Sequence, residues 1–116
     1  MNDPHLFDPS VYDKLCAELG AEDAAEVLQA FLTDSPRKLE MMSATADLPS
    51  IKRTAHSIKS SAATFGFTEL SALARDLESG IEAMSAARLH ESVGAVRQAY
   101  ERTAEFARTS LLQAAY

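Results

Sequence analysis

The apolar positions along this chain recur at the spacing of α-helices. Between residues 51 and 66, separations of 4, 3, 4 and 3 place five apolar side chains on one narrow stripe when the backbone turns by about 100° per residue. The stripe consists of Ile51, Ala55, Ile58, Ala62 and Phe65. Such a stripe is typical of a helix that packs lengthwise against other helices. We therefore predict a helix here, ended by Gly66 in a left-handed or tight-turn conformation.

The N-terminal region predicts a short first helix. Residues 1–7 precede any helix signal and are expected to form a flexible tail. Asp8 followed by Pro9 is typical of a helix start, because aspartate accepts free N–H groups and proline suits the first helical position. This helix should run to Glu18 and stop at Gly20.

A longer helix is predicted next, over residues 22–46, with an apolar stripe of the bundle type. Pro36 lies inside it and should kink the helix or divide it after Asp34, because proline lacks the N–H that a helix interior uses. The following break offers two candidate caps for the helix that comes after it, Asp47 and Ser50.

Two further helices complete the pattern. Thr68 is expected to cap a helix that reaches about Met84, and Ser85 to cap a last helix whose apolar seam continues to the C-terminus. The sequence therefore predicts an all-α protein, namely an antiparallel four-helix bundle with the additional short N-terminal helix packed across one end. We expect residues 1–116 to form a single domain.

Charge is distributed unevenly. The net charge is −6, with −7 in residues 1–47, +3 in residues 48–68 and −2 in residues 69–116. An acidic chain has no general affinity for nucleic acid or for an anionic membrane, so neither is expected as a partner. The only basic segment is the predicted helix around residues 51–66.

The composition indicates the expected compartment. No apolar run reaches the length of a membrane span, and the N-terminus does not resemble a signal segment. The single Cys16 cannot form an internal disulfide and is interpreted as a small residue of the first helix. We therefore expect a cytoplasmic protein.

The candidate chemistry lies at His56. On the predicted helix this residue falls well off the apolar stripe, on the side expected to face water. Its neighbours on that side are small or cationic: Lys52, Arg53, Lys59, Ser60 and Ala63. A structural histidine would be expected on the buried stripe, whereas an exposed one among cations is either functional or without a role.

These residues resemble a known family. The segment AHSIKSSAATFG, followed by ELSALARDLE, is similar to the signature of histidine-containing phosphotransfer (Hpt) domains, roughly AHxLKGxAxxxG followed by spaced leucines and LE. The resemblance implies that His56 is the phosphorylated histidine, and it also matches Lys59, Gly66 and Glu78. Ser60 stands where the family usually has glycine. The resemblance implies a partner-binding surface that we place at Lys52, Arg53, Ser60, Ala63 and Gly66.

Glu78 is a candidate partner for the imidazole. If Gly66 joins two antiparallel helices, the residues level with His56 lie roughly ten to twelve positions after the glycine. That window contains Asp76, Leu77 and Glu78. In one interpretation, Glu78 orients the ring by accepting a hydrogen bond from an imidazole N–H. In the other, Glu78 is a solvated helix residue without a role.

The residue types suit phosphoryl transfer. Neutral imidazole is a good nucleophile, and Lys59, one turn away, can stabilise the charge that spreads over the phosphoryl oxygens. Lys52 and Arg53 are candidates for steering the encounter with an acidic partner. The alternative is that both are solvated helix residues without a partner. Ser60 is small enough to let a partner approach, although its hydroxyl could instead bond to the carbonyl of His56.

The resemblance also implies partners and excludes some activities. The partners would be receiver domains of response regulators and of hybrid sensor histidine kinases, in two-component signalling of the bacterial type. We expect a monomer. Neither a cofactor nor a metal site is expected in this chain, because the Mg²⁺ of such a reaction belongs to the receiver domain. No glycine-rich loop suggests an ATP site, so no kinase activity is expected. The alternatives are a non-catalytic helical adaptor and the dimerisation bundle of a sensor kinase.

Overall fold

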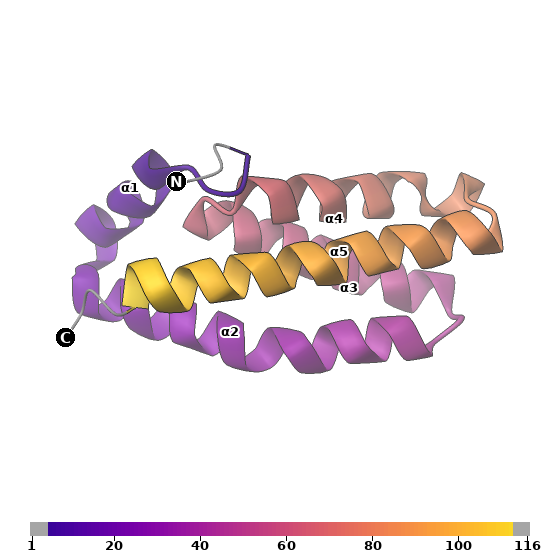
Figure 1. The fold of residues 1–116 in the computed structure, drawn as a ribbon, viewed down its shortest axis with the longest axis horizontal. Coiled ribbons are helices and arrows are strands. Elements are labelled where there is room, and N and C mark those ends of the chain that lie inside the picture. The colour runs from indigo at the N-terminus through magenta and orange to yellow at the C-terminus, as the bar shows by residue number, and fades with distance from the viewer. Residues whose placement is uncertain (1–4, 113–116) are drawn as a thin grey trace.

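The computed structural model describes residues 5–112, which form helices and turns with no strand among them (Figure 1). The all-α prediction is confirmed. The elements are α1 (Pro9–Leu19), α2 (Ala21–Ala44), α3 (Leu48–Phe65), α4 (Thr68–Gly80), a 3₁₀ turn (Ile81–Ala83), α5 (Ala86–Phe106) and a π-helical end (Ala107–Leu112).

The long helices lie beside one another along the length of the molecule (Figure 1). Helix α3 packs along α4, α4 packs along α5, and α2 contacts both α3 and α5. Helix α1 contacts α2 and α3 near the end where α3 turns into α4. The predicted stripe of α3 is buried throughout, from Ile51 to Phe65. Burial of this stripe leaves the opposite face of α3 to water.

Three of the predicted caps are confirmed. The side chains of Asp8, Asp47 and Ser85 each accept the backbone N–H of a residue two or three positions later, at 3.0–3.1 Å. The expected cap at Thr68 is wrong, because this residue is already helical and its hydroxyl donates to the carbonyl of His5 at 2.7 Å. The hydroxyl therefore holds the N-terminal segment and does not cap α4.

The expectation of a tail over residues 1–7 is also wrong for its last residues. The side chain of Phe7 is only 7% exposed, and its ring lies 4.8 Å from the ring of Phe106 and 6.0 Å from that of Phe67. Burying an aromatic ring at this end of the core fixes the segment before α1. Residues 1–4 lie outside the described residues.

Helix α2 continues through Pro36, so of the two outcomes expected there, a kink or a division, the division after Asp34 does not occur. A proline leaves the carbonyl four residues earlier without its helical donor. That carbonyl belongs to Leu32, and it accepts the hydroxyl of Tyr100 from α5 at 3.0 Å. Helix α5 thus supplies the hydrogen bond that Pro36 cannot make. Burial raises the pKa of Tyr100, so the hydroxyl stays protonated and remains a donor.

Gly66 ends α3 in the left-handed conformation predicted for it, with φ +84°. Its carbonyl accepts the backbone N–H of Asp8 at 2.8 Å, and a Cβ atom here would lie 2.5 Å from the carbonyl oxygen of Asp8. The position requires glycine both for the backbone angle and for the close approach of the segment before α1. This turn sends α4 back along α3.

Candidate functional site

The imidazole of His56 projects from the middle of α3 on the face opposite the buried stripe. Its side chain is 58% exposed. Two residues that follow on the same face, Ser60 and Ala63, are also exposed. The α3 sequence positions the histidine in this way because the apolar residues spaced by three and four occupy the core side.

Helix α4 brings an acid to this imidazole. The Oε2 atom of Glu78 lies 2.7 Å from Nδ1 of His56, and its Oε1 atom lies 2.9 Å from Nζ of Lys59. When the ring carries its proton on Nδ1, it donates to the carboxylate and leaves the Nε2 lone pair free. The contact considered for Glu78 from helix rise is therefore present, together with an ion pair to Lys59.

The carboxylate of Glu78 is held in its charged form. The ammonium of Lys59 lowers the pKa of Glu78, with a smaller effect in the same direction from His56, whereas partial burial acts in the opposite direction. The side chain is only 19% exposed, compared with 30% for Lys59. Glu78 therefore lies as an ionised, largely enclosed group between the two residues.

A second ion pair lies one turn toward the start of α3. The Nζ atom of Lys52 lies 2.6 Å from Oε1 of Glu82, which lies four residues after Glu78 in the 3₁₀ turn that follows α4. This contact raises the pKa of Lys52 and lowers that of Glu82. Lys52 thus stays charged with Glu82 as its acidic partner, and the pair joins α3 to the turn that follows α4.

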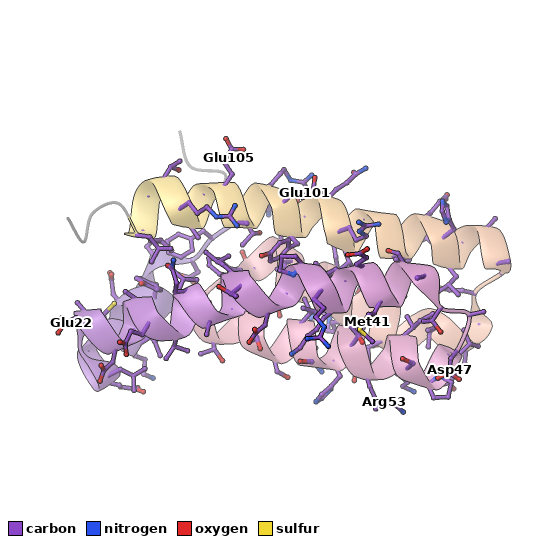
Figure 2. All side chains as sticks on the ribbon, turned by 90° about the horizontal axis from the view of Figure 1, so that it is seen from below. Glu22, Met41, Asp47, Arg53, Glu101 and Glu105 are labelled. Carbon is purple, nitrogen blue, oxygen red and sulfur yellow. The ribbon has the colours of Figure 1, made fainter. Side chains whose placement is uncertain are left out.

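Arg53 differs from Lys52. Figure 2 shows it projecting outward from α3, and no acid within residues 5–112 pairs with it. Of the two residues expected to steer a partner, Arg53 has the uncompensated charge.

Two contacts near the histidine were not found by sequence reasoning. Lys38 on α2 donates to the hydroxyl of Ser57 at 3.4 Å, beside a surface groove of about 270 Å³ between α2 and α3. The hydroxyl of Ser71 on α4 donates to the carbonyl of Lys59 at 3.1 Å, which ties the two helices together beside the site. Only the relative rotation of the helices reveals these pairs, and no sequence motif marks them.

The remaining residues of the proposed partner surface have different positions. Within the described residues, the Ser60 hydroxyl makes no hydrogen bond, so the bond considered back to the carbonyl of His56 is not formed. The carbonyl of Ser60 instead accepts the hydroxyl of Thr64 at 3.0 Å. Gly66 is buried under the start of α1, so it is inaccessible to a partner and we withdraw it from the surface.

The described residues offer neither a metal-binding cluster nor a membrane-spanning helix. Over residues 5–112 no group of three or more His, Cys, Asp or Glu side chains is placed to hold a metal ion. In the same range no helix is both long enough and apolar enough to cross a membrane.

Fold and site together describe a helical domain that presents the exposed imidazole of His56 beside a partly buried carboxylate and a lysine. The family model of the Hpt domain matches residues 26–106, which is more than two thirds of the chain and includes His56, so the chain belongs to the Hpt domain family. The family as a whole carries out histidine phosphotransfer in phosphorelays and interacts with receiver domains. No curated protein and no solved structure matches the chain.

Proposed function

We propose that this protein relays a phosphoryl group between the aspartates of receiver domains, with His56 as the intermediate acceptor. The observation that carries the proposal is the exposed imidazole whose Nδ1 is held by Glu78 at 2.7 Å, with Lys59 on the same carboxylate. One ring nitrogen is fixed and the other faces water, which is the arrangement that a nucleophile needs.

The transfer conserves atoms and charge without a cofactor in this chain. The Nε2 lone pair attacks the phosphorus of a receiver phosphoaspartate, a P–N bond forms, and the P–O bond breaks with its electron pair left on the aspartate. Lys59 lies one turn away and stabilises the negative charge on the phosphoryl oxygens. Donation to a second receiver is the reverse of these steps, and the Mg²⁺ required belongs to the receiver.

The scaffold supports this role as a closed unit. We propose that α2 to α5 act as an antiparallel four-helix bundle with α1 across one end, and that the chain works as a monomer in the cytoplasm. The rival interpretations differ in measurable ways: a sensor-kinase bundle is an obligate dimer, and an adaptor takes up no phosphate. The mass in size-exclusion chromatography with light scattering separates the first rival.

A transfer assay tests the proposal. Incubated with a panel of phosphorylated receivers, the wild-type chain should gain phosphate that is labile in acid and stable in base, as a phosphoramidate is. His56→Gln should abolish the uptake while helical content is unchanged. His90 lies on α5, outside the site, and His90→Gln is the matched control that should leave the uptake intact. Uptake by the His56 variant would refute the assignment. Labelling by ATP and Mg²⁺ alone would refute the absence of kinase activity.

A further inference from the structure

We propose that Glu78 makes phosphorylated His56 a stronger phosphoryl donor by keeping the ring protonated at Nδ1 after Nε2 has been phosphorylated. The inference rests on the proposed function of His56 and adds a second role for the acid. Holding the ring in place would require only an acceptor of the right shape, whereas this role requires the negative charge.

The geometry fixes that charge at the ring. One carboxylate oxygen lies 2.7 Å from Nδ1 and the other lies 2.9 Å from Nζ of Lys59, so each oxygen has a partner in the protein. The Glu78 side chain is 19% exposed and the His56 side chain 58% exposed. The acid is therefore a fixed support under a ring whose other edge is open to a partner.

The leaving group explains why the proton matters. When Nε2 takes up the phosphoryl group with the proton retained on Nδ1, the ring becomes a cation. When a receiver carboxylate, or water, later attacks the phosphorus, the P–N electron pair returns to Nε2 and neutral imidazole leaves. If Nδ1 had lost its proton, the leaving group would be the far more basic imidazolate anion. A carboxylate at hydrogen-bond distance stabilises the cationic ring and so favours the labile form.

The surrounding charges make Glu78 the determining group. The charged side chains of α3 besides His56 are Lys52, Arg53 and Lys59, those of α4 are Glu69, Arg75, Asp76 and Glu78, and Glu82 lies in the 3₁₀ turn that follows α4. On α2, Lys38 bonds to the neighbouring Ser57. The cations oppose protonation of the ring. Glu82 is engaged with Lys52, so Glu78 is the acid in contact with the imidazole among residues 5–112.

The experiment measures how the lability of the phosphorylated protein depends on pH. The protein is phosphorylated with phosphoramidate, whose own P–N bond breaks to release ammonia, and the loss of phosphate is followed by ³¹P NMR from about pH 6 to about pH 9, the range around ordinary imidazole titration. Glu78→Gln keeps an acceptor oxygen and removes the charge. Glu82→Gln makes the same change in charge one turn away and is the matched control.

We expect phosphate loss from Glu78→Gln to begin to slow at a lower pH than phosphate loss from the wild-type protein or from Glu82→Gln. At the alkaline end of the range, Glu78→Gln should then lose phosphate about tenfold more slowly than the other two. The same difference should appear in transfer to a receiver. The difference between the wild type and Glu78→Gln should persist when each of them also carries Lys59→Gln, because Glu78 acts on the ring directly. Its disappearance in that background would assign the effect to Lys59 and overturn the inference.

Further outcomes separate this inference from the proposed function. Equal pH profiles for wild type and Glu78→Gln would overturn the inference and leave His56 as the acceptor. A wild-type protein that takes up no phosphate would overturn the proposed function itself. The ¹⁵N shifts of the phosphorylated wild-type ring provide a check that needs no variant. They should remain those of a protonated ring over the whole pH range in which the rate of phosphate loss is level, and a change inside that range would contradict the inference.

Discussion

The hydrogen bond between Tyr100 and Leu32 should compensate for the proline inside α2, and removing it should be costly only while that proline is present. The Tyr100 hydroxyl lies 3.0 Å from the Leu32 carbonyl that Pro36 leaves without a helical donor. Tyr100→Phe removes the hydroxyl and leaves a buried carbonyl without a partner, which costs about 1–3 kcal/mol of unfolding free energy. Pro36→Ala restores the helical N–H and removes a helix-interior proline, so it should stabilise the protein by up to about 3 kcal/mol.

The two changes should therefore be coupled. In the Pro36→Ala protein the carbonyl of Leu32 has its helical donor, and Tyr100→Phe should cost about 1 kcal/mol less than it does in the wild type. Urea unfolding followed by circular dichroism measures all four proteins of this cycle. An equal cost of Tyr100→Phe in both backgrounds would show that the tyrosine does not compensate for the proline. Phosphate uptake, corrected for the folded fraction, should be the same in all four.

Four further predictions concern the site and its supporting turn. Gly66→Ala should lose about 2–4 kcal/mol in urea unfolding, because φ is +84° and the added Cβ lies 2.5 Å from a backbone carbonyl. Gly94→Ala, where the added Cβ would meet nothing beyond its own stretch of helix within 4 Å, should gain about 0.5–1 kcal/mol. Lys59→Ala should slow transfer about tenfold to hundredfold and change the free energy of unfolding by less than about 0.5 kcal/mol; transfer at the wild-type rate would remove the lysine from the mechanism. Ser60→Gly should support transfer, whereas Ser60→Tyr should block it in the same assay. Undiminished transfer by Ser60→Tyr would show that the partner does not approach over this position. Arg53→Glu should slow association with a cognate receiver in stopped-flow measurements at low salt and weaken its salt dependence, and an unchanged rate at low salt would exclude steering by this residue.

The helices could be predicted because their signals are local. The buried stripe of α3 and the left-handed Gly66 follow from spacing and backbone preference within one segment. The caps at Asp8, Asp47 and Ser85 likewise depend on residues two or three positions away. Phe7 has no such signal, because a single aromatic residue before a cap shows no periodicity and its burial depends on α5 folding back over it.

The site could be predicted only in part, for a related reason. Equal helix rise brought Glu78 level with His56, but whether it faces the ring depends on the rotation of α4 about its axis, which the packed core fixes. Packing also pairs Lys52 with Glu82 at 2.6 Å, a contact that the sequence of α3 alone cannot show. The continuation of α2 through Pro36 depends on Tyr100, which lies far away in the chain.

The measurement that tests the central claim most directly is a phosphorus-correlated NMR spectrum of the phosphorylated protein with ¹⁵N-labelled histidine. With Nδ1 of His56 held by Glu78 at 2.7 Å, the phosphorus should couple to Nε2 of His56. Coupling to Nδ1 would show that the Glu78 contact is broken in the reactive state. Phosphorus bound to His5 or His90 would contradict the account, because it would place the phosphoryl group on a residue outside the site formed by α3 and α4.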